Sequence, residues 1–312
     1  MTKTVELQAP DITPYKAGNT GVPYATTFDS GRSGPHVMVN ALVHGNELCG
    51  AIALDLLFRK NVRPKQGKLT LSFANVAAYE RFDPAKPEAS RFVDEDFNRV
   101  WSDDVLKGER NTIELRRARE MRPLMDTVDV LLDIHSMQKL AAPLALAGPL
   151  PKNRALSAEM GAPVYVVSDF GHQAGKRLRD YGGFGEAASH KRAALVECGQ
   201  HWLKPTADVA IDCALRFLLS QNVIDREFAA SHLLSWDPQR FVEVTHAVTI
   251  EHEPFEFVGS YHGLEVVEKA GTLIARDGAV EVRTPYDRCV MVMPSQRLSR
   301  GLTAVRLGRF TG

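Results

Sequence analysis

Short apolar runs alternate, along the first two thirds of the chain, with segments that have the length and pattern of helices. Residues 36–43 are apolar almost throughout and short enough for a buried strand, whereas residues 48–58 are apolar on nearly every face and long enough for a buried helix. This alternation predicts βαβ crossovers and an α/β fold with a mostly parallel sheet flanked by helices. The other candidates are strands at 69–76, 128–134, 144–147, 164–167 and 193–196, and helices at 112–124, 153–160 and 206–219.

The first strand–helix junction carries a histidine and a glutamate three residues apart, His44 and Glu47. Between them, Gly45 permits a tight turn and Asn46 is a good N-cap for the helix. Ligands bind at such junctions in open α/β sheets. By itself the pair is a weak signal, because a glutamate at a helix N-terminus is also favoured by the helix dipole.

Two further strands also end in ionisable residues, His135 after 128–134 and Glu197 after 193–196. Because parallel strands have their carboxyl ends at one edge of the sheet, we expect these side chains to converge with His44 and Glu47. Two histidines and a glutamate, with a fourth position left open, form the usual catalytic zinc site. Asp133 precedes His135 on the same strand face and either orients that imidazole or caps a nearby turn.

Residues 77–111 form a charged segment with little periodicity, which is unusually long for a plain connection. Its aromatic residues indicate a packed, ordered loop rather than a disordered one. Arg91 and Arg99 in this segment either bind substrate or pair with the acidic residues 94–96 as ordinary surface charges.

After about residue 221 the helical pattern disappears and short strand-like pieces follow one another, separated by Gly and Pro turns. We therefore expect a catalytic α/β domain at residues 1–222 and a small all-β domain at 223–312, as a compact barrel or sandwich. The strand candidates are 241–245, 248–252, 255–258, 264–267, 280–283, 290–293 and 303–307.

Composition limits the classes of function. Lys plus Arg and Asp plus Glu both number 38, so there is no excess of positive charge for nucleic acid or a membrane surface. No run of 18 apolar residues occurs, and the start has no apolar signal core. The four cysteines are widely spaced without a Cys-x-x-Cys motif, which favours free buried thiols and a cytoplasmic location.

Four groups of residues occur in a characteristic order: His44-Gly45-Asn46-Glu47, Asn98-Arg99, Asp133-Ile134-His135-Ser136, and Glu197. Together they resemble the succinylglutamate desuccinylase/aspartoacylase family of the wider zinc carboxypeptidase-like group. The resemblance covers residues of about 36–220 and, more loosely, the β-rich tail. It implies one Zn²⁺ per chain bound by His44, Glu47 and His135, with Glu197 as the general acid/base; the alternative for Glu197 is a buried salt-bridge partner.

The same resemblance implies roles for residues in the charged segment. Asn98 and Arg99 match the pair that grips the substrate carboxylate and polarises the scissile carbonyl. Arg91 lies eight residues before Arg99, where the family has a second substrate arginine.

Other substrate contacts of the family are harder to match here. Tyr181 is the candidate for a substrate-binding tyrosine, and either Arg177 or Arg179 for a further arginine. Tyr286 is a candidate for the tyrosine that reaches the site from the β-domain in some members. Cys198, although next to Glu197, is expected to be structural. His172, His190 and His201 have no spacing that distinguishes them from surface or core histidines.

The expected function is a zinc-dependent amidohydrolase that cleaves the amide bond of an N-acylated amino acid or a similar small carboxylate. Two alternatives remain open: a metallocarboxypeptidase acting on peptide C-termini with the same ligands, and a catalytically silent metal- or ligand-binding relative. Neither the acyl group, the amino acid nor the oligomeric state follows from the sequence, and a homo-oligomer stays open.

Overall fold

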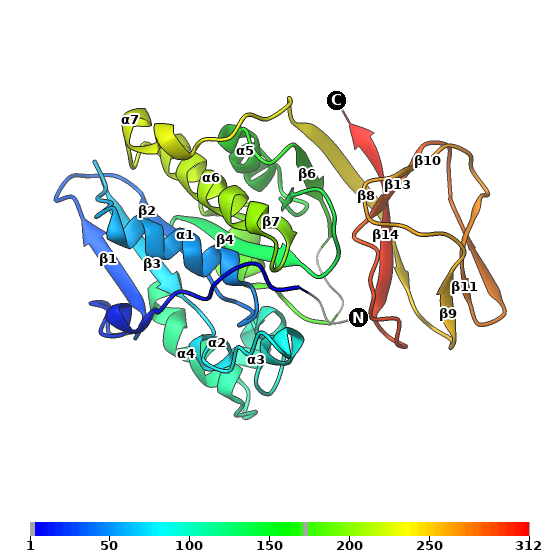
Figure 1. Cartoon of the computed structure of the whole chain (residues 1–312), viewed down its shortest axis with the longest axis horizontal. Coiled ribbons are helices and arrows are strands. Elements are labelled where there is room, and N and C mark those ends of the chain that lie inside the picture. The colour runs from blue at the N-terminus through cyan, green and yellow to red at the C-terminus, as the bar shows by residue number, and fades with distance from the viewer. Residues whose placement is uncertain (1–3, 171–173, 312) are drawn as a thin grey trace.

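A large mixed sheet runs through the whole molecule (Figure 1). The computed structural model describes residues 4–170 and 174–311. Within them, eleven strands form one sheet in the order β1-β3-β2-β4-β7-β5-β6-β8-β14-β13-β10, and three form a second sheet in the order β12-β11-β9. The predicted α/β class, with parallel core strands flanked by helices, is therefore confirmed.

The centre of the sheet is parallel, as the alternating pattern predicts. β3 and β4 both pair with β2 in parallel, and β7 pairs with β4 in parallel. Antiparallel pairs appear further out, where β1 joins β3 and β5 joins β7. The strands of this half are β1 (Ala25–Asp29), β2 (His36–Ala41), β3 (Lys68–Phe73), β4 (Val130–Met137), β5 (Leu144–Leu146), β6 (Tyr165–Ser168) and β7 (Arg192–Gln200).

Helices cover both faces of these central strands. Val37 and Val39 of β2 belong to the core beneath α1 and α6, whereas Met38 belongs to the opposite core, to which α4 contributes Leu115 and Met121. Burial on both faces explains why the strands read as continuous apolar runs rather than alternating ones. The helices are α1 (Leu48–Arg59), α2 (Val76–Tyr79), α3 (Asp103–Lys107), α4 (Ile113–Met125), α5 (Pro151–Met160), α6 (Lys204–Ser220) and α7 (Arg226–Ala229).

The turn between β2 and α1 differs from the expected one. Glu47, not Asn46, occupies the N-cap position, and the side-chain nitrogen and oxygen of Asn46 are buried without a hydrogen-bond partner among the described residues. A side chain at Gly45 would collide with the backbone of Ala78, Tyr79 and Ser90. Gly45 is thus required by the close approach of the charged segment.

The charged segment 77–111 is ordered, as its aromatic residues predict. Phe97 and Trp101 are fully buried and meet edge to face, with ring centroids 5.5 Å apart. A buried carboxylate also holds the segment: Glu114 on α4 accepts the backbone N–H groups of Val93 at 2.7 Å and Asp94 at 3.0 Å. The segment is therefore a fixed wall of the molecule.

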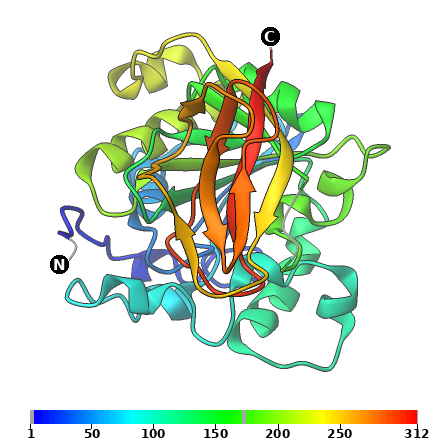
Figure 2. The same cartoon turned by 90° about the vertical axis from the view of Figure 1, so that its right-hand side faces the viewer.

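The C-terminal strands extend the large sheet instead of closing into a barrel of their own. β8 pairs in parallel with β6, and Leu195 and Val242 share one apolar cluster across the junction. The small second sheet lies at the right-hand end of the molecule in Figure 1, and this end faces the viewer in Figure 2. Two details of the strand prediction were wrong, since 241–245 and 248–252 contribute to one strand and 273–277 was missed. The strands are β8 (Arg240–Thr249), β9 (Phe255–Phe257), β10 (Val266–Val267), β11 (Leu273–Asp277), β12 (Val280–Arg283), β13 (Cys289–Val292) and β14 (Thr303–Thr311).

All four cysteines are buried and free, which agrees with the expectation of unpaired thiols. Among the described residues, no helix combines the length and the apolar character that crossing a membrane requires.

Candidate active site

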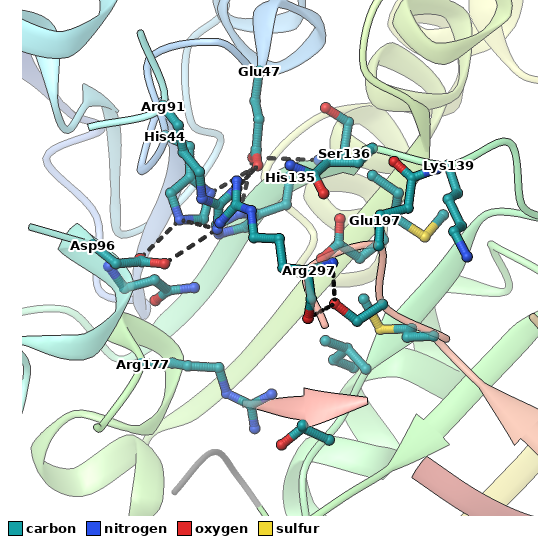
Figure 3. A pocket seen from close by; sticks show the side chains of 18 of the residues that line it. His44, Glu47, Arg91, Asp96, His135, Ser136, Lys139, Arg177, Glu197 and Arg297 are labelled. Atoms are coloured by element: carbon teal, nitrogen blue, oxygen red, sulfur yellow. Dashed lines mark hydrogen bonds and ion pairs between the residues drawn. The ribbon is translucent and has the colours of Figure 1, made fainter. Parts of the chain in front are cut away.

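A cavity of about 430 Å³ lies at the carboxyl ends of β2, β4 and β7 (Figure 3). His44, Glu47, His135 and Glu197 all line it, as the parallel arrangement of the strands predicts. Its opposite wall comes from the C-terminal half of the chain, including residues 293–297 between β13 and β14.

Three buried residues bring their ligand atoms together on one side of the cavity. His44 Nδ1 lies 2.7 Å from Glu47 Oε1, and His135 Nδ1 lies 2.9 Å from Glu47 Oε2. One ligand atom from each residue lies within 4.8 Å of the other two. Burial by itself would raise the pKa of Glu47, but the charges of His44 and His135 hold it well below its usual value. The carboxylate is therefore ionised and its negative charge favours a cation here.

Each of these histidines is oriented by an aspartate on its other ring nitrogen. His135 Nε2 lies 2.9 Å from Asp133 Oδ2, and Asn40 Nδ2 donates to the other oxygen of Asp133 at 2.9 Å. Asp133 thus has the orienting role rather than the capping one. His44 Nε2 lies 3.0 Å from Asp96 Oδ1, a contact that sequence spacing did not indicate.

This donor set fits a divalent cation. Two imidazole nitrogens and a carboxylate match a catalytic zinc site with an open position. Aspartates hold both Nε2 atoms, so both Nδ1 atoms point towards Glu47. Metal-binding histidines usually have such a carboxylate on the ring nitrogen that does not bind the metal. His44, Glu47 and His135 therefore form a site suited to one metal ion.

Glu197 faces the cavity from β7, directly before a bulge in that strand. The pairing of β4 with β7 shifts register directly after His135 and Glu197, where Gly199 has φ +124°, a conformation that favours glycine. Glu197 Oε2 is buried and has no hydrogen-bond partner among the described residues. Burial raises the pKa of Glu197 to about 8, against the opposing charge of His135. Such a carboxyl group is poised to exchange protons near neutral pH.

Asn98 and Arg99 also reach the cavity. The side-chain oxygen of Asn98 accepts the backbone N–H of Leu178 at 2.9 Å, which fixes the Asn98 amide. Arg99 donates from Nη1 to the backbone oxygen of Asn98 at 2.6 Å. Burial lowers the pKa of Arg99 to about 10, although Asp96 opposes the shift. No described carboxylate lies within ion-pair distance of this guanidinium, so it is free to bind an anion.

Arg91 lines the cavity but is engaged with the metal-site residues. Its Nη2 lies 3.2 Å from Asp96 Oδ2 and 2.9 Å from His44 Nε2, and its Nη1 lies 3.6 Å from Glu47 Oε1. Arg91 therefore braces the histidine side of the site, in addition to any contact with substrate.

The expected contacts from residues 177–181 look different in the structure. Arg177 lines the cavity, but Asp169 and Asp180 occupy its Nε and both Nη atoms at 2.8–3.1 Å. Arg179 is fully buried, with Nη2 on the carbonyl of Ala147. Tyr181 does not line the cavity: its hydroxyl donates to Asp126 at 2.6 Å, because the ring packs against Trp101.

Tyr286 lies away from the cavity as well. Its hydroxyl is 2.5 Å from Thr245 Oγ1, and Arg309 covers the face of its ring at 3.8 Å. The β-rich half contributes Arg297 and Arg306 to the cavity instead.

One histidine that sequence spacing could not distinguish does line the cavity. His201 is fully buried, and its Nδ1 lies 2.8 Å from Ser136 Oγ, while the Ser136 backbone N–H points to Glu47 Oε2 at 3.3 Å. Burial lowers the pKa of His201 to about 4, so the ring is neutral. His190 is exposed and paired with Asp129, and His172 lies outside the described residues.

Comparison with known proteins places this geometry in a family. The profile of the succinylglutamate desuccinylase/aspartoacylase catalytic domain matches residues 33–186. No curated protein sequence matches the chain at a significant level.

Solved structures share the fold at low sequence identity. Succinylglutamate desuccinylase from Vibrio parahaemolyticus aligns with a TM-score of 0.64 and 16% identity, over 90% of this chain and 83% of that one. The succinylglutamate desuccinylase from Chromobacterium violaceum aligns with a TM-score of 0.63 and 19% identity, over 93% and 89%. The product-bound ectoine utilization protein EutE (DoeB) from Ruegeria pomeroyi gives 0.63 and 17%, over 91% and 88%. Residues 33–186 of this chain therefore form a catalytic domain of the succinylglutamate desuccinylase/aspartoacylase family.

Proposed function

We propose that the protein is a zinc-dependent amidohydrolase that cleaves the amide bond of an N-acylated amino acid or a similar small carboxylate. The observation that carries this proposal is the convergence of three kinds of group on one cavity. They are a buried His–Glu–His triad, an unpartnered carboxyl group at Glu197 and a guanidinium without a carboxylate partner at Arg99.

His44, Glu47 and His135 would hold the metal, with Asp96 and Asp133 fixing the two imidazole rings. A zinc ion bound there supplies Lewis acidity, which polarises an amide carbonyl and lowers the pKa of water to about 7.

Glu197 acts as the general base and then as the general acid. Its free Oε2 takes a proton from the attacking water and returns it to the nitrogen of the leaving amine. Proton transfer by a positioned side chain contributes roughly 10²–10⁴-fold to the rate. The raised pKa of Glu197 favours its protonated form, which donates the proton to the leaving amine. The charge of a nearby cation favours its ionised form, which takes the proton from water.

Arg99 provides the positive charge that the substrate requires. A guanidinium can hold a carboxylate through two parallel hydrogen bonds or stabilise the oxyanion that develops on the carbonyl. Asn98 is rigidly held beside it and assists. Arg91 would be a second anchor beside Arg99 for a carboxylate of the amino-acid half, and it also keeps Asp96 and His44 in place.

A metallocarboxypeptidase would use the same ligands and differs in the room left for a peptide. Here residues 293–297 and Arg306 line one side of the cavity and reduce the room for an extended chain, which favours small acyl amino acids. A silent binding relative would retain the metal site without turnover.

One experiment separates these three functions. Zinc-loaded protein is incubated with a panel of N-acyl amino acids and dipeptides, and amine release is measured, with Glu197→Gln as the inactive control. Hydrolysis of acyl amino acids supports the proposal, whereas preferential release of C-terminal residues from the dipeptides supports the carboxypeptidase. If the protein hydrolyses neither kind of substrate, both enzymatic functions are contradicted. Metal analysis of the wild type and His135→Ala tests the zinc site independently: about one zinc per wild-type chain is expected, and near-zero zinc in both proteins would overturn the assignment.

A further inference from the structure

The wall of the cavity that faces the metal site comes from residues outside the family match at 33–186. It includes residues 293–297 and Arg306, on or next to β13 and β14. These residues reach the site because β8 joins β6 and carries the C-terminal strands alongside the catalytic half. Because this wall faces the metal site, its side chains are placed to contact a substrate and can influence which substrate is bound.

Most guanidinium groups of the cavity already have carboxylate partners. Arg177 is bound by Asp169 and Asp180, and Arg306 Nε lies 3.7 Å from Asp169 Oδ2. Arg91 is engaged with Asp96. Within the described residues, no carboxylate lies within ion-pair distance of either of the two remaining arginines of the cavity, Arg99 and Arg297.

The backbone that presents Arg297 is braced. Ser295 Oγ accepts the backbone N–H of Arg297 at 3.0 Å and donates to the carbonyl of the same residue at 3.1 Å. The Ser295 N–H in turn donates to the carbonyl of Ala304 at 2.7 Å, which ties the turn to β14. The Arg297 side chain therefore enters the cavity from a fixed base rather than from a loose loop (Figure 3).

The two free guanidinium groups have different surroundings. Arg99 lies among the charges of Asp96, Arg91, Arg177 and Arg306. The pKa of Arg297 is lowered by partial burial and by the charge of Arg91, whereas Glu88 and Asp96 oppose this shift. Arg91 and Arg297 line the same cavity from different segments, and an anion bound there would offset the repulsion between their positive charges.

We propose that Arg297 is a specificity-determining residue that binds a carboxylate on the acyl half of the substrate, while Arg99 serves the amino-acid half. This assignment rests on the proposed amidohydrolase function. The guanidinium offers a carboxylate two parallel N–H donors, which an uncharged acyl chain cannot use.

Kinetics with two acyl groups of equal length test this assignment. N-succinyl and N-butyryl derivatives of the same amino acid differ by a terminal carboxylate. For Arg297→Ala, we expect KM for the succinyl substrate to rise about tenfold or more, with kcat retained and KM for the butyryl substrate changed less than twofold. Arg297→Lys should recover part of the loss. Equal effects on both substrates, or no effect on either, would overturn the assignment.

Arg300→Ala is the matched control, since Arg300, like Arg297, is an exposed arginine of the connection between β13 and β14, but it lines a separate surface groove instead of the cavity. It should leave the ratio of succinyl to butyryl activity at the wild-type value. A change in that ratio as large as that of Arg297→Ala would show a general effect of surface charge, and would overturn the assignment.

A binding measurement keeps this inference separate from the proposed reaction. Zinc-loaded Glu197→Gln protein is titrated with succinate and with butyrate in a calorimeter, with and without Arg297→Ala. We expect Arg297→Ala to weaken succinate about tenfold and leave butyrate unchanged. If the parent protein binds succinate no more tightly than butyrate, the subsite does not exist. If succinate binding depends on Arg297 but no acyl amino acid is hydrolysed, the subsite stands and the proposed function fails.

Discussion

Asp96 Oδ1 lies 3.0 Å from His44 Nε2, so the first histidine of the metal triad is held by a residue of the charged segment, 52 positions away in the chain. The second histidine has a local equivalent, because Asp133 holds His135 from two residues earlier on the same strand. The metal site thus depends on a strand for one imidazole and on an irregular segment for the other.

We therefore expect Asp96→Asn to weaken zinc binding about 10–100-fold, the usual cost of losing a carboxylate that orients a metal-binding histidine. Asp133→Asn should have an effect of similar size. Zinc affinity measured in competition with a chelator checks both. Asp103→Asn is the control, because Asp103 is exposed, pairs with Lys107 and does not line the cavity. Wild-type affinity in Asp96→Asn would show that its contact with His44 does not support the metal.

Glu197→Gln tests the proton-transfer step. The change removes the proton acceptor while it preserves the size of the side chain, so zinc content and the unfolding transition should stay at wild-type values. We expect kcat to fall by about 10²–10⁴. A decrease of less than tenfold in steady-state assays would mean that Glu197 has a structural role.

Arg99→Lys tests the anion-binding guanidinium. An ammonium cannot reproduce the two parallel hydrogen bonds, so we expect kcat to fall and KM to rise together. Arg177→Lys provides the contrast: its guanidinium is already bound by Asp169 and Asp180, and its loss should reduce stability more than it changes KM. Kinetics and urea unfolding of both variants separate the roles. Unchanged kinetics in Arg99→Lys would remove Arg99 from the site.

The central part of this site could be predicted from the sequence because it follows from strand order. His44, His135 and Glu197 each stand at or near the carboxyl end of a buried apolar run, and parallel pairing brings those ends together. The ordered state of residues 77–111 was likewise predictable, since large aromatic side chains such as Phe97 and Trp101 are stabilised by burial in a core.

The parts that could not be predicted depend on contacts between distant segments. The contact of Asp96 with His44 could be predicted only if the path of the charged segment were known. This segment has no periodic pattern from which its path could be inferred. The ion pair between Arg177 and Asp169 is likewise visible only in three dimensions. From the sequence alone, Arg177 was therefore a candidate for a substrate contact. The reach of Arg297 follows from the β6–β8 pairing, which joins the two halves into one sheet.

The carboxylate of Glu114 provides a test of how the charged segment is held. It is fully buried and accepts N–H groups from Val93, Asp94 and Glu95, as well as the Asn75 side-chain amide at 3.1 Å. In Glu114→Gln, one acceptor oxygen becomes an NH₂ group that faces other donors. Since a buried unsatisfied polar group costs about 1–3 kcal/mol, we expect a loss of stability in that range.

Because Asp96 belongs to the same segment, Glu114→Gln should also weaken zinc binding. Urea unfolding and zinc competition check the two effects on one preparation. Glu120→Gln, on the exposed part of the same helix, is the control. Wild-type stability in Glu114→Gln would show that the segment is held by its aromatic residues alone.

The buried pair of Asp169 and Arg177 predicts a pH dependence of stability. Burial by itself would raise the pKa of Asp169, but the charge of Arg177 and the hydrogen bonds from it hold this pKa below its usual value. A carboxyl group whose folded pKa is depressed stabilises the protein above its unfolded pKa of about 3.9, and this contribution is lost as the pH falls through the folded value. Asp169→Asn should therefore lower the free energy of unfolding by about 3–5 kcal/mol at pH 7, because it leaves a buried guanidinium with one partner fewer.

The difference between wild type and Asp169→Asn should stay constant from pH 8 to about pH 5 and narrow below about pH 4, since protonation of Asp169 then removes the same charge in the wild type. Urea unfolding across this range measures it. Asp180→Asn is a comparison variant: Asp180 also binds Arg177, at 2.8 Å, and its side chain is 18% exposed against 1% for Asp169. Because Asp180 pairs with the buried Arg179 as well, at 3.1 Å, its loss should also destabilise the protein. A difference that widens as the pH falls would contradict the assignment, because the stabilising form of Asp169 would then be the protonated one.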